Sequence, residues 1–163
     1  MTKTASTWAP KGQPPILRRV SKRRVLSTAV ALTTNGRLLK CHFDHAVKGP
    51  DVIVALRHFR RYLHGPLIII WDRLTAHKDG EVQKWVADDA DLYVEWLPSY
   101  APDLNPEEGC NANIKARLRN ATPENEEQLR QLVDRAFDQL RKRPDIIQSF
   151  FKHAGLGEMT LYT

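Results

Sequence analysis

Short apolar runs alternate with amphipathic segments along this chain, and that pattern predicts an α/β fold. Runs rich in β-branched residues predict strands, and apolar residues at helical spacing predict helices. The predicted strands cover residues 25–33, 38–43, 67–71 and 92–97. The predicted helices cover residues 51–63, 79–88 and 106–119, then a long helix opened by Thr122-Pro123 and broken at Pro144, then a turn or two reaching Gly155.

Two features indicate how the strands pair. Asn35-Gly36 separates the first two strands and is a strong hairpin signal, so these strands are expected to be antiparallel. The run Leu67 to Trp71 is continuously apolar, as in a parallel strand that is buried on both faces. Strands that alternate with helices favour parallel pairing in the second half of the chain. We therefore expect one α/β domain.

The composition is that of an ordinary soluble domain, with 163 residues, 42% of them hydrophobic and 27% charged. The longest apolar run is far too short to span a membrane, and residues 1–13 lack the apolar stretch of a signal peptide. Cys41 and Cys110 give no disulfide framework, which fits a reducing compartment. The expected location is cytoplasmic, with no membrane partner.

The charge is distributed unevenly, and this favours a polyanionic partner. Residues 1–71 hold 13 Lys and Arg but only Asp44 and Asp51 as acids, whereas the remaining residues carry an acidic excess. Nucleic acid is the commonest partner of such a basic half. The alternative is a soluble protein that is basic on one side. The segment from Lys11 to Arg24 is a basic arm that could bind DNA phosphates. In the alternative it would be a solvated face of the hairpin.

Asp72 and Glu108 are the candidate catalytic residues. Asp72 follows a buried strand, where ligands bind in open α/β sheets, although aspartate is also a common turn residue. Glu108 lies in the first turn of a predicted helix that Asn105 caps, where it also fits a capping box. The two acids are separated by 35 residues. Paired carboxylates repel unless a cation lies between them, and Mg²⁺ suits such a site because it keeps positions open for water and phosphate.

Two longer segments resemble a known family. LIIIWDRLTAHKDGEVQKWV and LYVEWLPSYAPDLNPEEGCNANIKARLRN are similar to bacterial insertion-sequence transposases of the mariner superfamily. The resemblance implies a DDE endonuclease domain with an RNase H-like mixed sheet flanked by helices. It also implies that Asp72 is the second catalytic acid, that Glu108 is the third, and that both bind Mg²⁺ or Mn²⁺. Ala101 replaces the serine of the family's YSPDLNPxE segment. The implied substrate is DNA at transposon ends.

The family's first aspartate has no counterpart among these residues. In the family it lies on an opening strand ahead of a segment like Trp8-Ala9-Pro10, and residues 1–7 contain no acid. Asp44 and Asp51 do not stand in the matching context. We therefore expect the first, central strand and the helix-turn-helix region to be missing. The chain is then part of a split gene, whose partner is the upstream part of the transposase or a second copy of itself, or it is a decayed or misannotated fragment.

These observations predict a partial DDE catalytic domain over residues 1–163. Residues 1–24 form a basic arm and the start of the hairpin, residues 25–121 the sheet core, and residues 122–155 the C-terminal helices. The expected function is metal-dependent DNA cleavage and strand transfer at insertion-sequence ends, with this chain inactive alone. The alternative is a non-catalytic remnant that binds DNA or a partner subunit through its basic face.

Two histidine-bearing motifs remain open at this stage. His77 follows Asp72 by five residues and either contacts a phosphate or metal-bound water or hydrogen-bonds its own loop. Cys41-His42-x-x-His45 has metal-binding residue types, but adjacent residues on a strand point to opposite faces and no second pair follows at zinc-like spacing.

Overall fold

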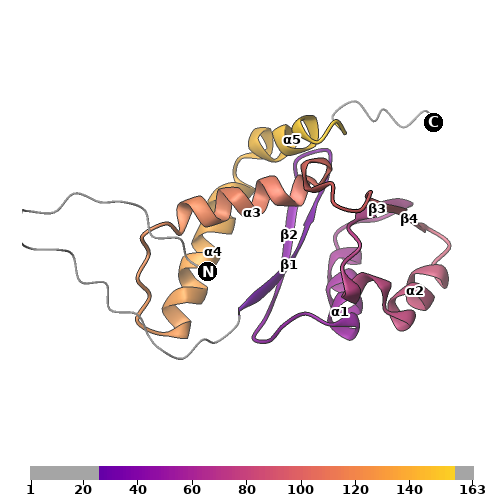
Figure 1. Ribbon diagram of the computed structural model, residues 1–163, viewed down its shortest axis with the longest axis horizontal. Coiled ribbons are helices and arrows are strands. Elements are labelled where there is room, and N and C mark those ends of the chain that lie inside the picture. The colour runs from indigo at the N-terminus through magenta and orange to yellow at the C-terminus, as the bar shows by residue number, and fades with distance from the viewer. Residues whose placement is uncertain (1–25, 157–163) are drawn as a thin grey trace, which may run out of the picture.

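A computed structural model describes residues 26–156 of the chain. This part contains four strands and five helices, arranged as in Figure 1. In chain order these are β1 (Ser27–Leu32), β2 (Leu38–Phe43), α1 (Gly49–Arg60), β3 (Leu67–Trp71), α2 (Gly80–Ala87), β4 (Leu92–Trp96), α3 (Pro106–Arg117), α4 (Glu126–Arg141) and α5 (Pro144–His153). Short 3₁₀ turns at Thr75–Lys78 and Pro102–Leu104 follow β3 and β4. The predicted alternation of strands and helices is confirmed.

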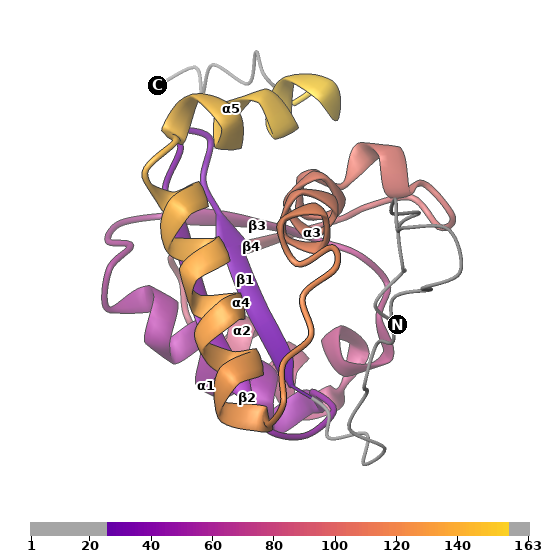
Figure 2. The ribbon, with the colours of Figure 1, turned by 90° about the vertical axis from the view of Figure 1, so that its left-hand side faces the viewer.

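β1 and β2 form the predicted antiparallel hairpin, with Ser27 opposite Phe43 and Leu32 opposite Leu38. Gly36 in its turn has a left-handed backbone with φ of +85°, which glycine adopts without steric cost. A Cβ at Gly36 would also lie 2.7 Å from the Cβ of Pro144. The hairpin turn is therefore pressed against the start of α5, as Figure 2 also shows.

β3 and β4 pair in parallel, with Leu67 opposite Leu92 and Trp71 opposite Trp96, as the apolar run predicted. The antiparallel and parallel pairs of the expected mixed sheet are both present. Within residues 26–156 they form two separate two-stranded sheets, because no described strand lies between them.

Two predictions about the C-terminal helices were wrong in detail. The long helix begins at Glu126 instead of at Thr122-Pro123, because the side chain of Asn125 caps it by accepting a hydrogen bond from Gln128 N. The segment after Pro144 is a helix of 10 residues instead of a turn or two, because Pro144 starts α5 as well as ending α4.

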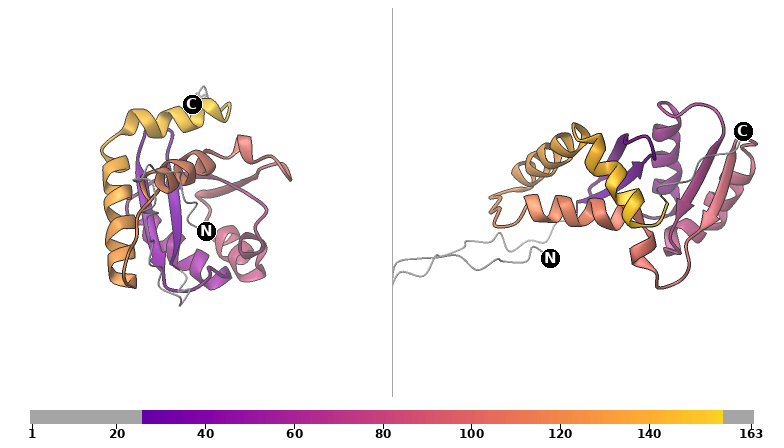
Figure 3. Two further views of the ribbon diagram at one scale, coloured as in Figure 1. Left: turned by 60° about the vertical axis from the view of Figure 1, so that its left-hand side comes forward. Right: turned by 90° about the horizontal axis from the view of Figure 1, so that it is seen from above.

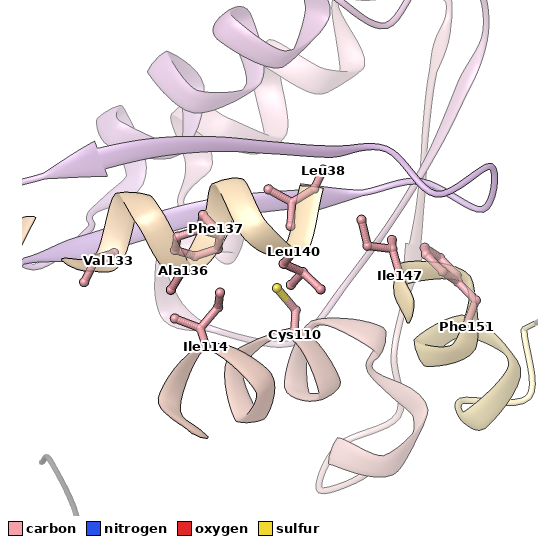
Figure 4. Packing of buried hydrophobic residues seen from close by; sticks show 9 residues of the cluster. All are labelled: Leu38, Cys110, Ile114, Val133, Ala136, Phe137, Leu140, Ile147 and Phe151. Carbon is pink, nitrogen blue, oxygen red and sulfur yellow. The ribbon is translucent and has the colours of Figure 1, made fainter. Parts of the chain in front are cut away.

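The buried residues form two clusters. The hairpin core lies between β2, α3, α4 and α5, and Figure 4 shows Cys110 of α3 pointing toward Leu140 of α4. Its members are Leu38, Cys110, Ile114, Val133, Ala136, Phe137, Leu140, Ile147 and Phe151. The sheet core lies where α1 and α2 cover β3 and β4, at the other end of the molecule in Figures 1 and 3. Its members are Val52, Trp71, Val82, Val86 and Leu92.

α1 connects the two ends of the molecule, since it contacts β1 and β2 as well as α2. None of the helices in the described range has the length and apolar character needed to cross a bilayer.

Candidate active site

A cleft of about 390 Å³ opens beyond the C-terminal ends of β3 and β4. Asp72 and Arg73 reach it from the loop after β3, and Lys78 reaches it from the following 3₁₀ turn. The loop after β4 supplies a second group of lining residues, namely Leu97, Pro98, Ser99, Tyr100, Ala101 and Pro102. Asn105 and Glu108 complete the lining from the start of α3. The two predicted catalytic residues therefore line one cleft.

Asp72 is held in a defined orientation at the end of β3. Its Oδ1 accepts a hydrogen bond from the backbone N of Leu74 at 3.0 Å and lies 2.9 Å from Nδ1 of His77. Nδ1 of His77 also lies 3.2 Å from the carbonyl oxygen of Asp72. Since both neighbours are acceptors, Nδ1 carries the proton and donates it. Oδ1 is thereby occupied, and Oδ2 is the oxygen available to a cation.

His77 is itself fixed by Trp71, the last residue of β3. The two rings are stacked, with centroids 4.7 Å apart and planes 11° from parallel. The structure therefore supports the reading in which His77 hydrogen-bonds its own loop. It does so through the carboxylate of Asp72, so the contact also orients a predicted catalytic group.

Glu108 is positioned by the start of α3. The side chain of Asn105 caps the helix by accepting a hydrogen bond from Glu107 N at 3.0 Å, and Pro106 occupies the first turn. Two residues after Glu108, the fully buried Cys110 fixes α3 in the hairpin core. Within the described range no hydrogen bond joins the Glu108 carboxylate to Asn105 N, so the capping-box interpretation of Glu108 is not supported. Its side chain is exposed and lines the cleft.

Glu107 is a third carboxyl group near the cleft, which sequence reasoning did not single out. The pKa of Glu107 is raised to about 7, first by burial and then by the negative charges of Asp72 and Glu108. A hydrogen bond with Asn111 opposes this shift in pKa. The sequence could have indicated the burial of Glu107. Glu107 lies three residues before the buried Cys110 and therefore on the same face of α3.

The donor atoms of the cleft suit a hard divalent cation. Carboxylate oxygens are the ligands that Mg²⁺ and Mn²⁺ prefer, and Asp72 and Glu108 present them beside two exposed cations, Arg73 and Lys78. The charges of Asp72 and Glu108 add to the effect of burial in raising the pKa of Glu107, and a bound cation would offset that part of the shift. Among residues 26–156, no group of three His, Cys, Asp or Glu side chains has the geometry to enclose a metal ion.

The remaining sequence candidates lie elsewhere. Neither Asp44 nor Asp51 is among the residues that line the cleft; both contact His45, at 2.9 and 3.1 Å. His42 is held between Thr28 Oγ1 at 2.8 Å and Asp134 Oδ1 at 3.0 Å, where it joins the hairpin to α4. The basic arm, residues 11–24, lies outside the described residues.

Sequence comparison identifies the family of the chain. A family profile described as DDE superfamily endonuclease matches residues 1–130, and the chain belongs to this family.

Structure comparison finds the same fold in a solved transposase, titled "Mos1 transposase paired-end complex with left transposon end". The TM-score is 0.58 at 17% sequence identity, and the match covers 93% of this chain. It covers 52% of the Mos1 chain, so the present chain spans about half of that protein. The likeness supports the RNase H-like α/β fold predicted from sequence. No curated protein sequence matches the chain.

Proposed function

We propose that Asp72 and Glu108 bind divalent metal for DNA cleavage and strand transfer at the ends of a transposon. The observation that carries this proposal is that the two carboxylates, which 35 residues separate in the sequence, line one cleft in a DDE superfamily chain. The Mos1 complex contains a transposon end, and we extend that class of substrate to this chain.

The cleft residues would have different roles in such a reaction. Bound Mg²⁺ or Mn²⁺ supplies charge neutralisation for the attacking and leaving oxygens of the phosphodiester. Asp72 offers Oδ2 to the cation while Leu74 N and His77 hold Oδ1. Glu108 contributes a second carboxylate from the rigid first turn of α3. Arg73 and Lys78 add positive charge for the phosphates, and Arg73 also joins the two loops by donating to the Leu97 carbonyl at 3.2 Å.

We further propose that these 163 residues alone do not cleave DNA efficiently. Cleavage with paired metal ions needs a third carboxylate, and Asp44 and Asp51, the only acids before Asp72, lie outside the cleft lining. The third acid then comes from polypeptide beyond these residues, either an upstream segment of the transposase or another subunit. Losing one metal-bridging ligand costs about a thousandfold in rate, by analogy with the removal of other groups that stabilise transition-state charge.

A nicking assay tests the proposal. A transposon-end duplex is incubated with Mg²⁺ or Mn²⁺ and either this chain or a version extended upstream by a strand bearing an aspartate. We expect nicking by the extended chain only, and its loss in Asp72→Asn and Glu108→Gln. Glu95→Gln is the matched control, because Glu95 is exposed on β4 and is not part of the cleft lining. Robust nicking by the 163-residue chain would mean that an acid within it, such as Glu107 or Asp44, completes the site.

A second function, DNA or subunit binding without catalysis, is favoured by the two-carboxylate donor set and the basic first half of the chain. Phosphate contacts make such binding steeply salt-dependent and nearly independent of DNA sequence. Assays of the extended chain distinguish the two functions. Binding of duplex DNA in low salt, without nicking in either Mg²⁺ or Mn²⁺, would support the function without catalysis.

A further inference from the structure

Tyr100, at the rim of the cleft, is the most exposed large hydrophobic residue of the described range. Its relative exposure is 102%, so the entire ring stands in solvent. Its backbone is left-handed, with φ of 60°, a conformation that a bulky side chain rarely adopts. Tyr100 is one of the residues that line the cleft, together with Asp72 and Glu108.

The surrounding loop explains how this conformation is imposed. Before Tyr100, the loop is anchored by buried Leu97, whose N donates to the carbonyl of Trp71 at 3.0 Å. After Tyr100, the 3₁₀ turn that starts at Pro102 leads directly into α3. The chain therefore reverses over few residues and pushes the Tyr100 side chain outward.

The exposure and the strained backbone are both unfavourable in the free protein. An exposed aromatic ring forgoes the burial that normally stabilises it, and a left-handed backbone is unfavourable for any residue with a Cβ. Since the whole side chain is in solvent, its contacts within the described residues do not offset these costs. Such strain is common where a side chain is held ready for a ligand.

The chemistry around Tyr100 identifies the ligand class. Exposed Arg73 and Lys78 line the same cleft and suit phosphate groups, while the Tyr100 ring offers a flat aromatic face. Phosphates linked to flat aromatic groups describe a nucleic acid strand, whose bases stack on aromatic side chains when they are unpaired. We infer that Tyr100 is a stacking platform for an unpaired nucleobase next to the phosphate bound in the cleft. The inference rests on the proposed function for the position of that phosphate.

The test uses transposon-end DNA carrying the fluorescent base 2-aminopurine, unpaired, beside the cleavage position. Stacking on Tyr100 quenches this fluorescence when the chain binds. We expect Tyr100→Ala to remove the quenching and weaken binding about 5- to 100-fold, and Tyr100→Phe and Tyr100→Trp to keep both. Tyr93→Ala is the matched control, because Tyr93 is 57% exposed on β4 and is not part of the cleft lining.

A second variant separates binding from folding. Tyr100→Gly relieves the left-handed strain, so we expect a higher melting temperature together with loss of quenching. Destabilisation by Tyr100→Gly with quenching intact would overturn the inference and make the ring a packing element. Absence of quenching with the unaltered chain, or equal quenching in Tyr100→Ala, would also overturn it.

The quenching test can fail or succeed separately from the test of the metal site. Asp72→Asn is expected to lose nicking in the extended chain while keeping the 2-aminopurine quenching. If Tyr100→Ala loses quenching but Asp72→Asn still nicks normally, the metal-site proposal is contradicted and the stacking inference stands. Normal quenching in Tyr100→Ala together with loss of nicking in Asp72→Asn would contradict the stacking inference alone.

Discussion

The hairpin core and the sheet core both contain fully buried residues, but they differ in how far helices enclose them. The hairpin core is surrounded by α3, α4 and α5 and includes Leu140 and Ile147 at 0% exposure. Within residues 26–156, helices cover only one face of β3 and β4. On the other face, Ile68 and Tyr93, which are paired across the two strands, are 45% and 57% exposed.

The candidate site takes one carboxylate from each region. Asp72 follows Trp71 of the sheet core, and Glu108 precedes Cys110 of the hairpin core. Each residue is thus oriented by its own core, whereas the distance between them depends on how the two cores sit together. A metal that binds both carboxylates would also tie the two regions to each other.

The largest expected effect of a truncation on stability is in the hairpin core. Leu140→Ala leaves a cavity at a fully buried position and is expected to lower the free energy of unfolding by about 3 kcal/mol. Val82→Ala, at a fully buried position of the sheet core, is expected to cost about 2 kcal/mol because it removes less volume.

Chemical denaturation followed by two probes shows whether the cores unfold together. Trp71, Trp85 and Trp96 all belong to or pack on the sheet core, so in a Trp8→Phe background tryptophan fluorescence reports on that region. Circular dichroism reports on all the helices. Because α1 contacts both regions, we expect coincident transitions in both variants. Separate transitions would show that the cores are independent units.

Glu107 makes stability depend on pH. Its pKa is raised by burial from 4.5 to about 7, so the folded state holds a proton that the unfolded state releases. The contribution of Glu107 to the free energy of unfolding should therefore be highest below pH 4.5 and fall by about 3 kcal/mol as pH rises to about 7. Glu107→Gln should flatten this part of the curve, measured by urea unfolding in the presence of a chelator. An unchanged slope would contradict the burial of Glu107, and exposed Glu81→Gln serves as the control.

His77 tests the half of the candidate metal site that belongs to the sheet core, because its ring contacts Asp72 and Trp71. His77→Leu removes the donor to Oδ1 of Asp72 and is expected to weaken Mn²⁺ binding about tenfold or more, measured by electron paramagnetic resonance. His77→Asn places an amide N–H near the position of Nδ1 and should restore most of the affinity. Equal losses in both variants would assign His77 a packing role against Trp71.

The smallest effect is expected on the open face of the sheet. Ile68→Lys should change the free energy of unfolding by less than about 0.5 kcal/mol, because Ile68 is 45% exposed. The matched comparison, Ile147→Lys in the hairpin core, should prevent folding. A large loss from Ile68→Lys would show that this face is covered in solution.

The sequence predicted best where local signals were strong. β2 and β3 begin and end at the predicted residues, because Asn35-Gly36 and Gly65-Pro66 mark their limits. The start of α4 was predicted wrongly, since Thr122-Pro123 and Asn125 are both suitable starts and only the observed hydrogen bond to Gln128 N distinguishes them. Glu107 was missed because its burial depends on the packing of α3, whose apolar pattern is weak. The orientation of Asp72 also required the structure, because the stacking of His77 on Trp71 cannot be inferred from spacing alone.

The most direct test of the shared metal site is a crystal structure of the chain soaked in Mn²⁺, with the ion located by its anomalous scattering. The prediction is a Mn²⁺ ion bound by both Asp72 and Glu108, with their carboxylates about 4–8 Å apart, as metal–oxygen bonds near 2 Å require. Carboxylates more than about 12 Å apart in well-ordered density, or Mn²⁺ bound by neither residue, would contradict the account.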